Sequence, residues 1–185
     1  MHYHHPLEGQ ELTVLKASPF TIRPVPDCAR FSLRIDPDRR DAASAVFGLE
    51  LPGAIGGLTS SGEKTAICLG PDEWYLLAPA AEKEVVEKSF GDLYGREIHS
   101  LTDISHREVG IAVEGREAAL ALQSAIAFDV EAMPVGSGRR TLFDKAQIVL
   151  LREAEDRFRI EVWHSFSEHV WHLLQAAGRE IELGI

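Results

Sequence analysis

The chain has 185 residues, 45% of them hydrophobic and 26% charged, which is close to the usage of ordinary globular proteins. Its 19 Lys and Arg residues are outnumbered by 29 Asp and Glu residues, so the formal net charge is −10 with neutral histidines. Because affinity for phosphate backbones comes mostly from clustered Lys and Arg, this balance argues against nucleic acid as a partner.

The hydropathy pattern predicts no membrane-spanning helix, since no window approaches the roughly 18 apolar residues that a span needs. The N-terminus lacks the basic start and the apolar stretch of a secretory signal. Two cysteines, Cys28 and Cys68, lie in no metal-binding or disulfide spacing and are expected to be free thiols. The sequence therefore predicts a cytoplasmic protein.

The first half of the chain alternates short strands and helices after about 20 polar and irregular residues. Phe31, Leu33 and Ile35 alternate with polar residues, as in a half-buried strand. A helix over 36–47 ends at Gly48, and the Gly- and Ser-rich stretch 49–64 predicts a loop. Further elements follow: a hairpin of strands 65–69 and 74–78, then a helix over 81–90.

The second half repeats this order. Its predicted elements are a strand over 109–113, a helix over 118–125, a break at 133–138, a hairpin formed by a strand within 140–151 and one over 158–163, and a helix over 166–177 ending at Gly178. The repeat predicts an α+β fold of two similar subdomains, each an antiparallel sheet with helices packed on one face, of the split βαβ or ferredoxin-like type. The expected ranges are a flexible segment 1–20 and subdomains 21–98 and 99–185, packed as one compact unit.

Motifs that carry chemistry are scarce. No glycine-rich phosphate loop, nucleophile elbow or zinc-binding HExxH motif occurs. Asp103, Ser105 and His106 combine the residue types of a catalytic triad, but residues so close on one segment rarely meet as a relay. We expect a turn in which the Asp and Ser side chains bond the backbone. The scattered histidines, including those at 2, 4 and 5, predict no metal site.

Four segments together resemble the gamma subunit of heterotetrameric sarcosine oxidase. They are LGPDEWYLLAP (69–79), TDISHREVGIAVEG (102–115), AFDVEAMPVGSGRRTLF (127–143) and DRFRIEVWHSFSEHVWHLLQAAGRE (156–180). The second and third are also similar to the folate-binding region of the glycine-cleavage T protein, which implies a shared fold. Where that family keeps a catalytic Asp before an apolar strand, this chain has Ala146 and Gln147, and Asp144 lies two residues upstream.

The resemblance implies a structural gamma subunit without an active site of its own, in an αβγδ complex that oxidatively demethylates sarcosine to glycine in one-carbon metabolism. It implies packing against the alpha subunit, with FAD, FMN, NAD and tetrahydrofolate bound by the partner subunits and no cofactor or metal in this chain. The alternative is a stand-alone tetrahydrofolate-binding protein or an aminomethyltransferase-like enzyme in one-carbon transfer. The motifs and the aromatic and Arg side chains suggest the following partner interface: Trp74, His106, Arg107, Trp163, His164, Ser165 and Phe166. Core packing would explain the tryptophans equally well.

Overall fold

The computed structural model describes the chain except for residues 1–4, 15–19 and 185. Its contacts divide into two compact units. The central unit consists of Asp27–Ser105 with Gly136–Arg139, and the terminal unit of Met1–Pro26, His106–Val135 and Arg140–Ile185. Each unit has an antiparallel sheet with its own hydrophobic core.

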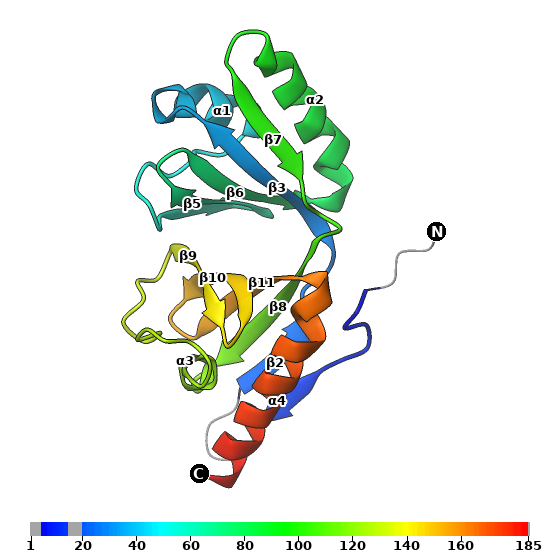
Figure 1. Cartoon of the computed structure of the whole chain (residues 1–185), viewed down its shortest axis with the longest axis vertical. Helices are drawn as coiled ribbons and strands as arrows, with labels where there is room; N and C mark the ends of the chain where they lie inside the picture. Colours follow the sequence, from blue (N-terminus) through cyan, green and yellow to red (C-terminus); the bar gives the residue numbers. More distant parts are fainter. Residues whose placement is uncertain (1–4, 15–19, 185) are drawn as a thin grey trace. The chain divides into compact units, whose positions relative to one another are not determined.

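The central unit has a five-stranded sheet. In spatial order its strands are β4 (Leu58–Ser61), β5 (Lys64–Gly70), β6 (Glu73–Pro79), β3 (Cys28–Ile35) and β7 (His99–Asp103). The helical segments are η1 (Pro37–Arg39), α1 (Arg40–Phe47), η2 (Ala80–Glu82) and α2 (Lys83–Tyr94). The period-two pattern explains their arrangement, because β3 places Phe31, Leu33 and Ile35 in the core beneath the helices. In Figure 1, α2 lies alongside β7.

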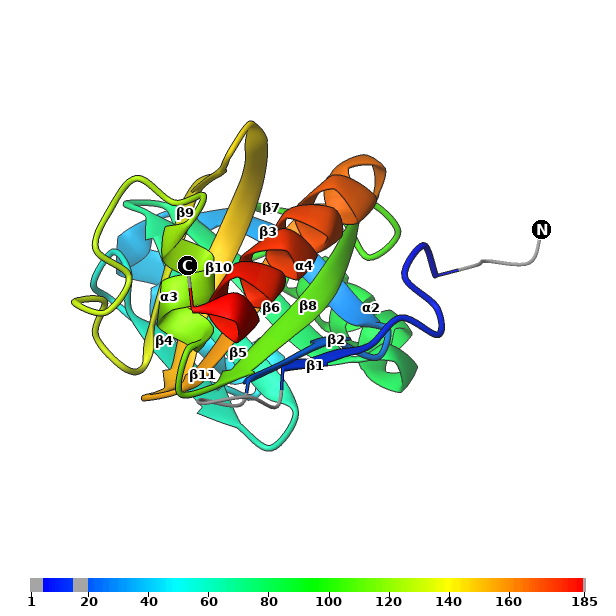
Figure 2. The ribbon, with the colours of Figure 1, turned by 90° about the horizontal axis from the view of Figure 1, so that it is seen from below.

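The terminal unit has a six-stranded sheet. In spatial order its strands are β1 (Leu12–Val14), β2 (Phe20–Pro24), β8 (Glu108–Gly115), β11 (Arg157–Trp163), β10 (Ala146–Ala154) and β9 (Ser137–Phe143). Three helical segments complete it: α3 (Ala118–Gln123), η3 (His164–Phe166) and α4 (Ser167–Leu183). Figure 2 shows α3 and α4 side by side over the strands.

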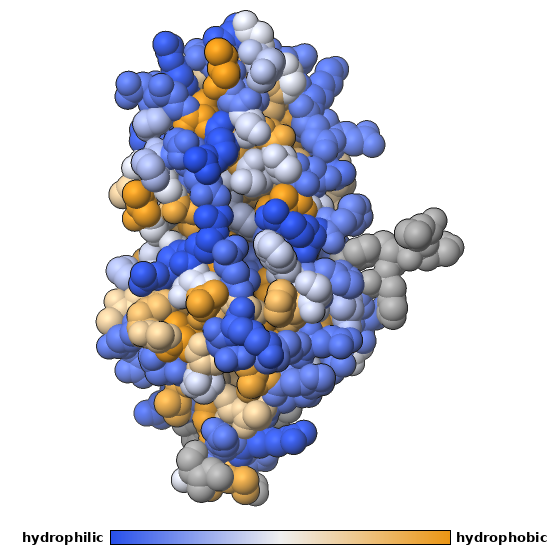
Figure 3. All heavy atoms as spheres, in the orientation of Figure 1, coloured by the Kyte–Doolittle hydropathy of each residue, from blue (hydrophilic) through white to orange (hydrophobic). Residues whose placement is uncertain are grey.

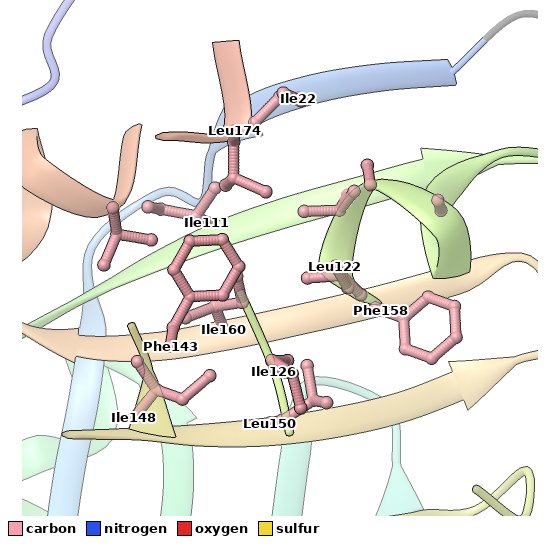
Figure 4. Close-up of a cluster of buried hydrophobic side chains, with 14 of the residues drawn as sticks. Ile22, Ile111, Leu122, Ile126, Phe143, Ile148, Leu150, Phe158, Ile160 and Leu174 are labelled. Carbon is pink, nitrogen blue, oxygen red and sulfur yellow. The ribbon is translucent and has the colours of Figure 1, made fainter. Parts of the chain in front are cut away.

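The core of the terminal unit forms where α3 and α4 meet one face of this sheet. Phe143 lies in the middle of the cluster in Figure 4. Its ring is surrounded by apolar side chains of the strands and of both helices. Leu122 of α3 and Leu174 of α4 cover it from the helix side. The predicted α+β class, two antiparallel sheets with helices packed on one face, is confirmed.

The structure corrects the prediction for the last helix. Gly178 does not end α4 but is buried inside it, and the helix continues to Leu183. Gly184, with φ of 73°, adopts the left-handed conformation that commonly ends a helix. The prediction that the helix ends at Gly178 is wrong because the sequence alone does not distinguish a glycine inside a helix from a glycine that ends one.

Besides β1 and β2, which precede the first predicted strand, three strands were not predicted as separate elements. β4 lies in the predicted loop 49–64 and pairs with β5 across a turn at Gly62, whose φ is 58°. β7 precedes the predicted strand over 109–113. β9 and β10 are separate strands, whereas the sequence predicted one strand within 140–151. All three are edge strands or contain few apolar residues, so they lack the alternation that identifies a half-buried strand.

The two units differ from the predicted ranges 1–20, 21–98 and 99–185. Strand β2, from the predicted first subdomain, pairs with β8 in the terminal unit, with Ile22 opposite Val113. Strand β7, from the predicted second subdomain, pairs with β3 in the central unit. Within the predicted flexible segment, β1 pairs with β2, and Leu7 is fully buried in the terminal core. No helix in the described ranges is long and apolar enough to cross a membrane.

Candidate functional site

Residues of the predicted interface come together at one end of the sheet of the terminal unit. β8 and β11 pair antiparallel, so Trp163, the last residue of β11, lies opposite Glu108, the first residue of β8. The backbone N–H of His164 donates to the carbonyl of Arg107 over 2.7 Å. The pairing of strands far apart in sequence therefore brings Arg107 next to Trp163 and His164.

The guanidinium of Arg107 is held from two sides. Its carbon lies 5.5 Å from the centre of the Trp163 ring, within the range of a cation–π contact. Its Nη2 and Nε atoms lie 2.8 and 3.2 Å from Oε1 of Glu108, whose side chain is 6% exposed. Trp163 is 40% exposed and the Arg107 side chain 50% exposed. We call Arg107, Trp163, His164 and Ser165, all exposed, the Arg–Trp surface.

The other predicted interface residues differ in their surroundings. His106 is exposed at the start of the terminal unit's second segment. Phe166 is half-buried and packs against the terminal core, so it supports η3. Trp74 is only 1% exposed and belongs to the central core, where its Nε1 donates to the Pro52 carbonyl over 2.9 Å. The proposal of Trp74 as a contact residue is therefore corrected, because core packing leaves it no surface.

The turn predicted around Asp103 is confirmed. The backbone N–H of Ser105 donates to Oδ1 of Asp103 over 2.9 Å, and the Ser105 hydroxyl accepts from the backbone N–H of Arg30 over 3.0 Å. Lys83 lies 2.7 Å from Asp103. Burial by itself would raise the pKa of the Asp103 carboxyl, but hydrogen bonds from Lys83 and Ser105 outweigh it and lower that pKa. Asp103 and Ser105 thus stabilise a turn.

The position at which the resemblance to the T protein implies a carboxylate holds Ala146 and Gln147, and neither is acidic. Ala146 is fully buried in the terminal core, and Gln147 is exposed. Asp144 occupies the turn before β10 with φ of 52°, and its Oδ2 lies 2.8 Å from Nε2 of His169 on α4. This hydrogen bond, with the backbone N–H of Lys145, lowers the pKa of Asp144. Asp144 therefore links a turn to a helix.

The two cysteines differ in exposure and are not joined in a disulfide. Cys68 is 1% exposed, burial raises the pKa of its thiol, and its Sγ donates to the Gly70 carbonyl over 3.1 Å. Cys28 is half-buried and, as expected, is not part of a disulfide. In the part of the chain that the structure describes, no group of three His, Cys, Asp or Glu side chains is placed to hold a metal ion. His2 and His4 lie outside the described residues.

Sequence reasoning missed a hollow in the central unit. It has a volume of about 500 Å³ and is lined by Glu87, Phe90, Gly91 and Tyr94 of α2 and residues 99–101 of β7. The His99 ring makes edge contacts with Phe90 and Tyr94, at centroid distances of 5.4 and 5.6 Å. The signal in the sequence was Gly91, a glycine inside an otherwise ordinary helix. On the face drawn in Figure 3, hydrophilic residues are interspersed with smaller hydrophobic groups.

Comparisons with known proteins give a consistent result. The model of a family described as the sarcosine oxidase gamma subunit family matches residues 33–180. A chain of heterotetrameric sarcosine oxidase from Corynebacterium sp. U-96, in complex with pyrrole 2-carboxylate, is similar with a TM-score of 0.82 and 27% identity. That match covers 92% of this chain and 89% of the other. No curated protein sequence matches this chain.

Two more distant structures share the fold. The glycine cleavage system aminomethyltransferase T from Bartonella henselae matches with a TM-score of 0.65 and 15% identity, over 83% of this chain and 44% of that chain. This chain thus spans less than half of that protein. The regulatory subunit of aspartate kinase from Thermus thermophilus matches with a TM-score of 0.55 and 12% identity, over 84% and 96%.

Proposed function

The chain belongs to the sarcosine oxidase gamma subunit family, and from this we propose that it is a non-catalytic subunit that contacts its partners through the Arg–Trp surface. It is the gamma subunit of a heterotetrameric sarcosine oxidase, which is a multi-subunit complex. The observation that carries this assignment is the family match over residues 33–180. A stand-alone role in one-carbon transfer is not favoured.

The chemistry of the described residues supports a structural role. The one nearby acidic candidate for a T-protein-like carboxylate, Asp144, is hydrogen-bonded to His169, and Ala146 is in the core. A working catalytic carboxylate needs placement within about 0.5 Å of its productive geometry, and Asp144 lies two residues upstream of Ala146, a displacement of several ångströms along the chain. We propose that FAD, FMN, NAD and tetrahydrofolate are bound by the partner subunits and that the complex is cytoplasmic.

We propose the alpha subunit as the direct partner and the Arg–Trp surface as part of the contact. Trp and Arg are enriched among the residues that contribute most to interface stability. The contact with Glu108 restricts the Arg107 side chain before a partner binds, which lowers the entropy lost on binding. Trp163 offers a large aromatic side chain, and the residue is 40% exposed. The surface therefore combines an exposed aromatic side chain with a preorganised guanidinium group.

Co-expression with the alpha, beta and delta subunits tests the contact. We expect Trp163→Ala and Arg107→Ala each to weaken assembly by at least tenfold, measured as the concentration at which the purified complex dissociates. The matched controls are Leu142→Ala, 55% exposed, and Arg157→Ala, whose side chain is 51% exposed. Assembly unchanged in both test variants would remove the Arg–Trp surface from the proposal.

The absence of catalysis is tested on the isolated chain. We expect no peroxide formation from sarcosine and no visible flavin absorbance after purification. Calorimetric titration with tetrahydrofolate is expected to give no saturable heat at micromolar concentration. A micromolar dissociation constant for the isolated chain would contradict the structural role and favour the folate-binding alternative.

A further inference from the structure

The outer edge of β7 carries backbone groups that no described strand of the sheet pairs with. β7 is the last strand in the order β4-β5-β6-β3-β7 and pairs with β3 on one side. The N–H of Ile104, just after β7, donates to the Arg30 carbonyl over 2.9 Å. Because bonded and non-bonded residues alternate in antiparallel pairs, Thr102 and Ser100 also point their backbone groups toward β3.

The same alternation directs the backbone groups of His99, Leu101 and Asp103 outward. These residues lie opposite Ile35, Leu33 and Phe31 of β3 in the register. Opposite residues share a face of the sheet, so the side chains of these β7 residues lie on the face covered by α2. A strand added to this edge would bond to them and direct alternate side chains toward α2.

The hollow described above lies at this position, between β7 and α2. His99 and Leu101 belong to its lining, together with Phe90, Gly91 and Tyr94 of α2. Tyr94 is 59% exposed, and Ile98, immediately before β7, is 84% exposed. The edge therefore combines backbone groups that no described strand pairs with and an aromatic and apolar hollow of about 500 Å³.

Gly91 keeps this recess open. A Cβ built at this position meets no atom within 4 Å, and its φ is not in the left-handed region. Neither packing nor backbone conformation therefore requires glycine here, although glycine is unfavourable inside a helix. A side chain at position 91 would project into the hollow, so the glycine serves to leave space for something outside the helix.

Charge indicates what fits there. Nζ of Lys83 on α2 lies 2.7 Å from Oδ2 of Asp103 and 3.8 Å from Oε1 of Glu87. One cation therefore faces two carboxylates beside the hollow, which Glu87 helps to line. Glu84 adds a further negative charge near Lys83. The net charge of the chain is −10. A second copy of the chain would bring these carboxylates close to the same carboxylates of its partner, which is unfavourable. A segment with a basic side chain would instead complement the negative charge beside the hollow.

We propose that an extended segment of another subunit adds as a strand to the outer edge of β7, with a large apolar side chain in the hollow and a basic side chain beside Glu87. This inference rests on the proposed function, because the segment belongs to a partner in the complex. Strand addition gives affinity through backbone hydrogen bonds and specificity through the pocket for a side chain. The surface is distinct from the Arg–Trp surface, which belongs to the terminal unit.

Hydrogen exchange resolved to single amides tests the strand addition directly. We compare the isolated chain with the chain in the purified complex. The N–H groups of His99, Leu101 and Asp103 are expected to exchange at least tenfold more slowly in the complex, while those of Ser100 and Thr102, already bonded to β3, change little. Unchanged exchange at the three outward amides of an assembled complex would overturn the strand addition and leave the gamma-subunit assignment intact.

A filled hollow gives an independent test. Gly91→Leu is expected to leave the melting temperature of the isolated chain unchanged or raised and to weaken assembly at least tenfold. The matched control is Gly95→Leu, since Gly95 also has open space around its Cβ and a φ of −68° but does not line the hollow. Assembly of Gly91→Leu at the wild-type concentration would overturn the proposal.

Two further outcomes are informative. If the isolated chain dimerises and its outward β7 amides are protected by that dimer, a second copy occupies the edge and the proposal is wrong. If the wild-type chain does not assemble with the other subunits at all, both the proposed function and this inference fail.

Discussion

The guanidinium of Arg107 lies 5.5 Å from the centre of the indole ring of Trp163, although the two residues are 56 positions apart in the sequence (163 − 107). Pairing of β8 with β11 creates this contact, and buried Glu108 fixes the arginine in place. Trp163 differs in this respect from Trp74 and Trp171, each of which is 1% exposed. The three tryptophans of the chain therefore divide into one surface residue and two core residues.

Trp163 is expected to dominate the quenching of tryptophan fluorescence by acrylamide. Replacing Trp163 with Phe should leave emission from Trp74 and Trp171 that is quenched far less, because both indoles are buried. Arg107→Ala should increase quenching, since it uncovers one face of the Trp163 ring. Stern–Volmer titrations of the isolated variants measure both effects, and equal quenching of Trp163→Phe and the wild type would contradict the assignment.

Glu108→Gln should loosen Arg107 without removing it. The variant keeps the shape of the side chain but replaces a charge-assisted hydrogen bond with a weaker one. We expect assembly to weaken by less than it does in Arg107→Ala, and acrylamide quenching of Trp163 to increase. A Glu108→Gln variant with wild-type quenching and assembly would show that Glu108 has no positioning role.

Trp74→Phe should destabilise the central unit by about 1–3 kcal/mol, because the Pro52 carbonyl loses its donor and the smaller ring leaves space in the core. Denaturant unfolding measures the change. At temperatures near the melting temperature of the variant, assembly is expected to fall only because a smaller fraction of the chain is folded. At low temperature, where the variant is folded, a complex of wild-type affinity is expected. Weakened assembly there would return Trp74 to the interface.

Gly110→Ala should destabilise the terminal unit by about 1–3 kcal/mol, the usual cost of an overpacked site. A Cβ at position 110 would lie 2.9 Å from Cβ of Val25 and 3.1 Å from Oε1 of Glu161, closer than ordinary contacts. Gly70→Ala is the matched control, because its Cβ would lie 3.5 Å from Cβ of Glu73. Denaturant unfolding should separate the two variants, and equal midpoints would show that the sheet relaxes around the new methyl group.

The pair formed by Asp103 and Lys83 should make stability depend on pH at the acid end. The pKa of Asp103 is lowered in the folded chain, so the carboxylate contributes stability above the unfolded pKa of about 3.9. That contribution is lost as the pH falls through the folded value. Asp103→Asn and Lys83→Met should each flatten the loss of stability between about pH 5 and pH 2, measured by unfolding in urea. An acid limb as steep as that of the wild type would contradict this assignment.

Sequence patterns predicted the elements that bury a regular apolar face. Alternation at Phe31, Leu33 and Ile35 predicted β3, and an apolar stripe with Val170 and Leu174 predicted α4. These predictions succeeded because a buried face imposes its period on the sequence. β7 was not predicted because HSLTD is an edge strand in which only His99 and Leu101 are half-buried and the other residues are exposed, so its sequence shows no clear apolar period.

The sequence by itself determined the α+β class, the family and the absence of a catalytic carboxylate at Ala146 and Gln147, because these depend on local periodicity and on which residue types are present. Tertiary structure alone decided that Trp74 is core and Trp163 is surface, that Arg107 stacks on Trp163, and that Gly91 opens a hollow beside β7. The physical reason is strand pairing. The register between strands that are distant in sequence decides which side chains meet. The residues next to a tryptophan or a glycine in sequence therefore do not determine whether the tryptophan is buried or whether the space beside the glycine is filled.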